Sequence, residues 1–439
     1  MLEQRKLFGA CYAGVLEAPQ VYRERRRKLA QAIGSQGVAV LLGGSDTRSY
    51  GDVGTFRQEP NFFYLTGVEL PNAVLLVGQE QDVLYLPPRK PSLEAWTGPR
   101  YGPGEETAAA LGFSEVKNLL PSEVVVQARL RPLPGFEDEL ASSLASGKQL
   151  WLPLPPPKAS GPLSREQELA CRLRERLPSF SLHDLTPILA KLRLRKEEGE
   201  LALLREAVRI TAEGIRAVAA ALQPGVREAA LEGLAYASFR REGAEGWAFP
   251  PIVASGEAGC ILHYDQNAGI CREGELVVVD IGARYGYYCG DLSRTLPVSG
   301  SFSPRQAEVY DAVLEAYQAA LRELRPGSNL AAMRHAAFEA LARTGLKGDR
   351  GRPLSEFFIH GIGHFLGLEA HDPGGDSEVF EPGMVVTLEP GVYLPQEGIG
   401  IRIEDDYLVT PEGALCLTPA SLPRRREEVG KLVRGTRTA

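Results

Sequence analysis

Four carboxylates and one imidazole, scattered over the C-terminal third, constrain this chain more than any other feature. They are Asp280, Asp291, His364, Glu389 and Glu404, in the segments VVVDIGARYGYYCGDLSRT, HGIGHFLGLEAHD, TLEPGVY and GIRIEDDY. If the fold buries four ionised carboxylates together, they repel one another strongly unless cations balance their charge. Oxygen ligands with one nitrogen suit divalent first-row metal ions, which share such sites at separations of ~3.5–4 Å. The set therefore predicts a dinuclear metallohydrolase.

The two aspartates are expected to lie side by side on a hairpin. ELVVVD predicts a buried strand that ends on Asp280, and the glycines between 282 and 286 allow the chain to return. The segment YYCGDLSRTL predicts a second strand that brings Asp291 beside Asp280. A single aspartate more often ends a strand or caps a turn. Two aspartates on paired strands favour a shared site instead.

Histidines cluster in the segment HGIGHFLGLEAHD, which holds His360, His364 and His371. A fourth, His263, lies in ILHYDQN. A lone histidine is more often a hydrogen-bonded structural residue than a metal ligand. Three histidines in so short a glycine-rich stretch indicate a functional site. The spacing is not HExxH, which excludes the helical zinc-protease motif.

Glu389 and Glu404 are expected at strand ends. Glu389 follows the apolar run MVVTL and precedes Pro390 and Gly391. In GIRIEDDY, strand alternation places Arg402 and Glu404 on the same side. A buried arginine beside a buried glutamate is usually a structural ion pair. The alternative is that Arg402 orients a carboxylate that binds metal.

Short apolar runs alternate with helical stretches in the N-terminal half, which indicates an α/β unit. Proline-rich LPLPPP marks a rigid segment near its end. We expect a boundary at about residues 175–188, with domains at 1–180 and 186–439. The second domain is expected to begin with one long amphipathic helix, KLRLRKEEGELALLREAVRITAEGIRAVAAALQPG, closed by Pro224 and Gly225.

Composition excludes several classes of partner. A net charge of -7 argues against general affinity for nucleic acid, which needs an excess of Lys and Arg. The cysteines are scattered without a CxxC pair, which suggests reduced thiols in a cytosol. We find no apolar run of membrane-spanning length and no signal-like N-terminus. These observations predict a cytoplasmic protein that does not enter membranes.

The order of GCILHY, the DIG–GD pair, HGIGH–HD, LEPG and GIRIED resembles the creatinase/aminopeptidase P/methionine aminopeptidase superfamily, whose fold is called pita-bread. The likeness covers residues 186–439. It implies that Asp280 chelates one metal, that Asp291 and Glu404 bridge two, and that His364 and Glu389 hold the second. Two divalent ions are expected. The oxygen-rich ligands favour Mn²⁺, with Co²⁺ or Zn²⁺ as alternatives.

The same resemblance places further residues around the substrate, namely His263, His360, His371 and Arg402. Glu389, as a carboxylate at the edge of the metals, is the best candidate to accept and relay a proton during hydrolysis. His371 and His263 would hydrogen-bond the carbonyl oxygen as it becomes an oxyanion. The chain departs from the family twice. Ser293 stands where the family generally has Thr, and Ala370 replaces a β-branched residue.

The N-terminal half resembles the N-terminal domain of aminopeptidase P, in YGDVGTFRQEPNFFYLTGVELPNAVLLV and EAWTGPRYG. The stretch LTPASLPRRREEV near the C-terminus is also similar to that family. An α+β chain is implied, in which a creatinase-like α/β domain precedes the pita-bread domain. The N-terminal domain would support a homodimer or homotetramer and contribute to the substrate pocket, with Trp96 as the candidate residue.

The implied activity is that of an Xaa-Pro aminopeptidase, which releases the first residue of peptides with proline in second position. A prolidase, restricted to Xaa-Pro dipeptides, is the nearest alternative. Creatinase-like hydrolysis without metal and a non-catalytic scaffold are two others. Retention of all five ligand positions argues against both of these.

Overall fold

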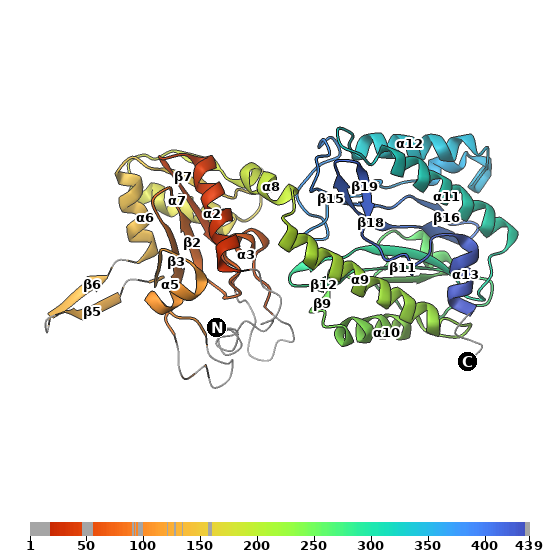
Figure 1. Ribbon diagram of the computed structural model, residues 1–439, viewed down its shortest axis with the longest axis horizontal. Coiled ribbons are helices and arrows are strands. Elements are labelled where there is room, and N and C mark those ends of the chain that lie inside the picture. Colours follow the sequence, from red (N-terminus) through yellow and green to blue (C-terminus); the bar gives the residue numbers. More distant parts are fainter. Residues whose placement is uncertain are drawn as a thin grey trace. The chain divides into compact units, whose positions relative to one another are not determined.

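The computed structural model describes residues 18–45, 56–89, 92, 94, 100–120, 122–126, 129–133, 135–156 and 160–434 (Figure 1). The chain folds into two compact units, one up to Leu192 and one from Arg193. This division lies a few residues after the boundary that the sequence suggests. Trp96, the candidate pocket residue, lies outside the described residues.

The first unit is built on a six-stranded sheet with the order β4-β3-β2-β1-β7-β8. Its strands are β1 (Gly37–Leu42), β2 (Val74–Val77), β3 (Asp82–Leu86), β4 (Glu115–Asn118), β7 (Gln149–Leu152) and β8 (Leu182–Asp184). Strand β1 pairs antiparallel with β2 and parallel with β7, so the sheet is mixed. Apolar runs alone do not distinguish this arrangement from a parallel sheet, because buried strands look alike in both.

Helices cover both faces of this sheet, which explains its nearly continuous apolar strands. The other elements are α2 (Pro19–Ile33), α3 (Pro60–Thr66), α5 (Glu105–Leu111), α6 (Phe136–Ala145), α7 (Arg165–Arg176) and the hairpin β5 (Ser122–Val126) and β6 (Arg129–Leu133). Val38 and Val40 share a core with Phe136 and Leu140 of α6. Helices α2 and α3 contact β1. The expected α/β character of this half is observed.

The second unit places its strands between two pairs of helices (Figure 1). Its helices are α9 (Glu198–Ala221), α10 (Glu228–Arg241), α11 (Pro304–Glu323), α12 (Leu330–Arg343) and α13 (Arg426–Arg434). The strands form four small sheets: β10 (Ile252–Ser255), β11 (Leu276–Ile281) and β14 (Leu292–Pro297); β9 (Gly246–Trp247), β12 (Ala283–Tyr285) and β13 (Tyr288–Cys289); β15 (Val385–Leu388), β18 (Asp405–Thr410) and β19 (Gly413–Cys416); β16 (Gly391–Leu394) and β17 (Ile399–Arg402). Helices α9 and α10 share one core with β11 and β14, and α11 and α12 share another with β15 to β18.

The prediction of one long helix at the start of the second domain is wrong. The segment forms α8 (Thr186–Leu194) and α9, with a break at residues 195–197. At the break Arg195 forms a β-bridge with Met384, and the N–H of Lys196 donates to the carbonyl of Gly383 at 2.8 Å. The amphipathic pattern does not reveal this interruption, because the partners of the broken turn are distant in the sequence.

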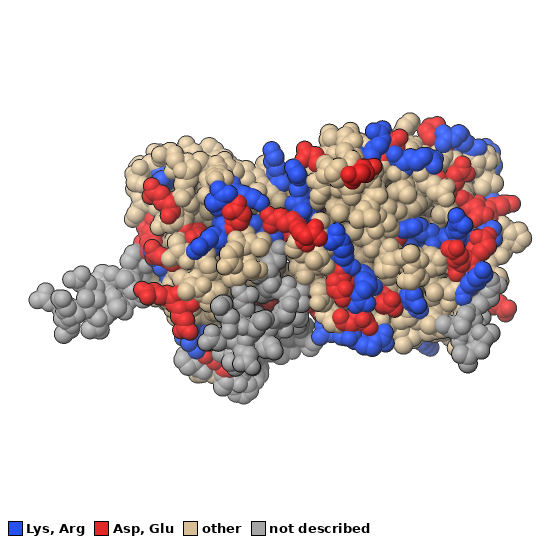
Figure 2. All heavy atoms as spheres, viewed as in Figure 1, with Lys and Arg blue, Asp and Glu red and all other residues tan. Residues whose placement is uncertain are grey.

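Among the described residues, each helix is too short or too polar to cross a lipid bilayer. Acidic and basic side chains are interspersed over the described part of the visible face (Figure 2).

Candidate active site

The pairing of β11 with β14 brings the two aspartates together. Asp280 on β11 lies opposite Ser293 on β14, and Asp291 immediately precedes β14. The returning chain is more elaborate than a simple turn, because it also forms β12 and β13, and β12 pairs with β9. The predicted antiparallel return is therefore observed, except that Asp291 lies between β13 and β14 and not within a strand, and the residue paired with Asp280 is Ser293.

The two glutamates reach the same place from neighbouring strand ends. Glu389 follows β15, Glu404 precedes β18, and Leu388 on β15 is paired with Asp405 on β18. The N–H of Glu404 also donates to the carbonyl of Ser293 at 3.1 Å. This bond joins the segment that leads into β18 to β14, the strand that directly follows Asp291.

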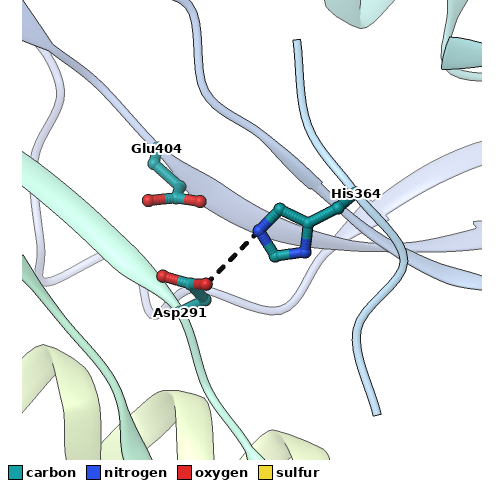
Figure 3. A group of neighbouring side chains, drawn as sticks. All are labelled: Asp291, His364 and Glu404. Atoms are coloured by element: carbon teal, nitrogen blue, oxygen red, sulfur yellow. Dashed lines mark ion pairs between the residues drawn. The ribbon is translucent and has the colours of Figure 1, made fainter. Parts of the chain in front are cut away.

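Asp291, His364 and Glu404 point toward one another (Figure 3). One ligand atom from each side chain lies within 4.8 Å of the others. Nε2 of His364 lies 3.5 Å from Oδ2 of Asp291 and 3.7 Å from Oε1 of Glu389. Nδ1 of His364 is 3.2 Å from the carbonyl of Phe365, which can only accept, so Nδ1 carries the proton. The lone pair of Nε2 is left facing the carboxylates, as a metal ligand requires.

The electrostatics of the cluster also fit a divalent cation. Burial raises the pKa values of Asp291 and Glu404 well above their ordinary values, and repulsion among the neighbouring carboxylates adds to this rise. Burial also raises the pKa of Glu389 to about 7, although His364 and Arg402 oppose the rise. Oδ1 of Asp280 is buried without a hydrogen-bond partner among the described residues. A cation would pair that oxygen and relieve the repulsion.

Arg402 links two carboxylates of the cluster, Asp280 directly and Glu404 through the hydroxyl of Ser293. It donates to Oδ2 of Asp280 at 2.6 Å and, through Nε, to the hydroxyl of Ser293 at 3.1 Å. Ser293 in turn donates to Oε2 of Glu404 at 2.9 Å. The ion pair of Arg402 is therefore made with Asp280, and Glu404 is reached through Ser293. Arg402 and Glu404 do face the same side, as strand alternation predicts.

Tyr393 was not singled out from the sequence, yet it joins Arg402 to His360. Arg402 donates to the Tyr393 hydroxyl at 2.8 Å, and this hydroxyl lies 2.9 Å from Nε2 of His360. Nδ1 of His360 is 2.7 Å from the carbonyl of Gly361, so it carries the proton and Nε2 accepts from Tyr393. Burial and the charge of Arg402 lower the pKa of His360 to about 4, which keeps the ring neutral at pH 7. The feature of the sequence that could have identified Tyr393 is its place between two apolar core residues, Val392 and Leu394.

The other two histidines of the predicted site, His263 and His371, are exposed. The His371 ring stands 4.3 Å from the His364 ring, centroid to centroid, in an edge-to-face contact. Partial burial, followed by the charges of His364 and His263, lowers the pKa of His371. His263 is exposed, in the chain between β10 and β11. His371 thus lies beside His364, His360 lies beside Glu389, and His263 lies near enough to His360 and His371 for its charge to lower the pKa of both.

Two families match the chain in sequence. Residues 202–411 match Metallopeptidase family M24, and residues 22–131 match the Aminopeptidase P, N-terminal domain. The Xaa-Pro aminopeptidase of Escherichia coli is 34% identical, over 94% of this chain and 97% of its own length. That of Haemophilus influenzae is 31% identical, over 94% and 96%.

Solved structures agree over both units. Aminopeptidase P of Escherichia coli with the inhibitor Pro-Leu has a TM-score of 0.84 at 30% identity, covering 96% of this chain and 100% of its own. Proline aminopeptidase P II of Yersinia pestis has a TM-score of 0.82 at 32% identity, covering 95% and 100%. These matches confirm the expected α+β fold, with an N-terminal domain followed by a pita-bread domain. The chain belongs to the aminopeptidase P family of Xaa-Pro aminopeptidases, within the M24 metallopeptidases.

Proposed function

We propose that the carboxylate cluster is the catalytic centre of an Xaa-Pro aminopeptidase, which releases the first residue of peptides with proline in second position. The convergence of Asp291, Glu389 and Glu404 around Nε2 of His364 is the observation that carries this proposal. Because the chain belongs to the M24 metallopeptidases, we assign this cluster to metal binding and peptide hydrolysis. Catalysis is assigned to residues 186–439, and subunit contacts and part of the substrate pocket to residues 1–180.

The metal ligands would be Asp280, Asp291, His364, Glu389 and Glu404, holding two divalent cations. When bound, such cations polarise a substrate carbonyl and lower the pKa of water, so that a nucleophile is available near neutral pH. The predominance of oxygen ligands favours Mn²⁺, with Co²⁺ or Zn²⁺ as alternatives.

Glu389 is the group proposed to move the proton. Its Oε1 lies 3.7 Å from His364 and its Oε2 lies 3.8 Å from His360, at the edge of the cluster. A carboxyl group so placed accepts a proton from the attacking water and passes it to the departing proline nitrogen.

The histidines and Arg402 complete the site. His263 and His371, both exposed, donate to the carbonyl oxygen as negative charge develops there. Neutral His360, Tyr393 and Arg402 form a hydrogen-bonded chain that ends on Asp280, which keeps that carboxylate oriented.

Selectivity for proline follows from the chemistry of its amide, which lacks an N–H and carries a rigid ring. A shaped apolar pocket can recognise such a ring, and Trp96 is the residue proposed to contribute to it across a subunit contact. This role implies a homodimer or homotetramer. A cytoplasmic location and peptide substrates, without nucleic acid or membrane partners, are proposed with it.

The function is tested with a dipeptide, Ala-Pro, and a tripeptide, Ala-Pro-Ala, each with and without Mn²⁺. We expect release of alanine from the tripeptide, loss of the activity on chelation, and its return with Mn²⁺. The tripeptide Ala-Ala-Ala is the control and is expected to be a poor substrate. Cleavage confined to Ala-Pro would show a prolidase, and activity that survives chelation would exclude the metal mechanism.

A further inference from the structure

Three buried charges lie next to the active site without belonging to the carboxylate cluster. Oδ1 of Asp372 accepts from Arg193 at 2.6 Å, and Oδ2 accepts from Lys196 at 3.1 Å. The side chains of all three are at most 2% exposed. We call Arg193, Lys196 and Asp372 the Asp372 group.

The group ties down the loop that carries two site histidines. Asp372 directly follows His371, and its N–H donates to the carbonyl of Phe365 at 2.9 Å. The same carbonyl is 3.2 Å from Nδ1 of His364, so it also fixes the tautomer of that ring. The His371 ring packs edge-on against His364. Residues 364–372 therefore form a closed loop with a site histidine at either end, and the Asp372 group lies behind it.

The two basic residues of the Asp372 group lie at the junction between α8 and α9. Arg193 lies at the end of α8, and Lys196 lies in the break between α8 and α9. The backbone of this break is bonded to Gly383 and Met384, which directly precede β15, the strand that leads to Glu389. The support that holds the histidine loop is thus continuous with the strand that holds Glu389.

Burying a carboxylate with two cations is costly, and it is tolerated only where charge pairing and geometry are good. Burial alone would raise the pKa of Asp372, but Lys196 and Arg193 bring it below its ordinary value. Glu369 also contacts Arg193, at 2.7 Å, but its side chain is 43% exposed. Asp372, the residue beside His371, is therefore the carboxylate that is buried and strongly held, whereas Glu369 is not.

We propose that Asp372, held by Arg193 and Lys196, is a positioning residue that directs Nε2 of His364 and the ring of His371 at the carboxylate cluster. This inference rests on the proposed function, because it assigns His364 to the metal and His371 to the substrate. Partners of ligating histidines typically influence metal affinity or activity by ~10–100-fold.

The test compares the full-length variants Asp372→Asn, Arg193→Met and Arg193→Lys with the parent. Each is assayed for kcat and KM on Ala-Pro-Ala and, after removal of metal, for Mn²⁺ affinity by titration calorimetry. Thermal unfolding reports whether each variant is folded. Arg195→Gln is the matched control, because it lies on the same segment and its ion pair with Glu381 is largely exposed.

We expect Asp372→Asn and Arg193→Met to lower kcat or Mn²⁺ affinity by about 10–100-fold, with KM within about twofold of the parent. Arg193→Lys, which keeps the charge, should recover most of the loss, and Arg195→Gln should match the parent. If Asp372→Asn does not fold, the two Arg193 variants decide.

The inference is overturned if the folded variants match the parent in kcat and Mn²⁺ affinity. It is equally overturned if Arg193→Lys is as impaired as Arg193→Met, since the charge would then not matter. A parent that binds Mn²⁺ but does not cleave Ala-Pro-Ala would refute the proposed function instead. Mn²⁺ affinity would still report on the positioning of His364 in that case.

Discussion

At the scale of single residues, one hydroxyl joins the charged groups behind the metal site. Ser293 accepts from Arg402 and donates to Glu404, with distances of 3.1 and 2.9 Å. The sequence marks this position as a departure from the Thr that the family generally has. Because serine keeps the hydroxyl, the departure preserves the connection.

Removal of this hydroxyl should therefore matter more than a change in its size. In Ser293→Ala, buried groups of Arg402 and Glu404 each lose a partner, which typically costs ~1–3 kcal/mol per unsatisfied group. We expect lower stability in urea unfolding and a reduced kcat. Ser293→Thr is the control and should retain both. Equal stability and kcat in Ser293→Ala would show that the hydroxyl has no such role.

At the scale of elements, helix α10 holds the segment that carries His263. The buried carboxylate of Glu228 accepts from the N–H and hydroxyl of Ser255, from the hydroxyl of Tyr264 and from the N–H of Gly269, over 2.6–3.0 Å. One side chain thus satisfies four donors, which lie at the end of β10 and within the chain that leads on to β11. The position of His263 depends on this contact.

Glu228→Ala should loosen that segment. Since several buried donors lose their acceptor, we expect a destabilisation of roughly 2–5 kcal/mol and faster proteolysis within residues 256–270. Glu213→Gln is a suitable control, because its ion pair with Arg216 is long, at 3.8 Å, and partly exposed, and such pairs contribute at most ~1 kcal/mol. Unchanged proteolysis in folded Glu228→Ala would contradict the assignment.

At the scale of the whole molecule, folding and metal binding are coupled through the buried carboxylates. In the absence of metal, folding brings together groups that repel one another, and proton uptake is the remaining way to reduce that repulsion. Repulsion among the buried carboxylates therefore lowers the free energy of unfolding, and bound cations offset this loss.

This coupling predicts that Glu389 makes the metal-free protein less stable as pH rises, which is the opposite of the usual effect of a carboxylate. Its pKa rises from an ordinary 4.5 to about 7 on folding. Between these values the unfolded chain has lost the proton and the folded chain has kept it, so stability falls as pH rises. One pKa unit is worth ~1.4 kcal/mol, so the parent should lose about 3 kcal/mol relative to Glu389→Gln between pH 4 and pH 8.

Urea unfolding of metal-free parent and Glu389→Gln at several pH values measures this difference directly. The charge of Glu389 also acts on the buried carboxylates of Asp291 and Glu404, so the comparison reports the titration of the coupled cluster, to which Glu389 contributes. Added Mn²⁺ should stabilise the parent more at pH 8 than at pH 5, because cations and protons compete for the same oxygens. A stability difference that does not vary with pH would contradict the prediction.

The sequence by itself determined the parts of the protein that depend on local pattern. Apolar runs revealed the strands that end on Asp280 and Glu389, and alternation placed Arg402 and Glu404 on one side. Motif order identified the family and the fold. These features are readable because strand period and turn residues act over a few neighbouring positions.

Only the tertiary structure decided the contacts between distant segments. Ser293 meets Glu404 across 111 positions, and Arg193 meets Asp372 across 179. The break between α8 and α9 and the link from Tyr393 to His360 arise in the same way. Each depends on which strands and helices pack together, and burial of charge then decides which groups must pair. That information belongs to the packed molecule, because no single segment carries both partners.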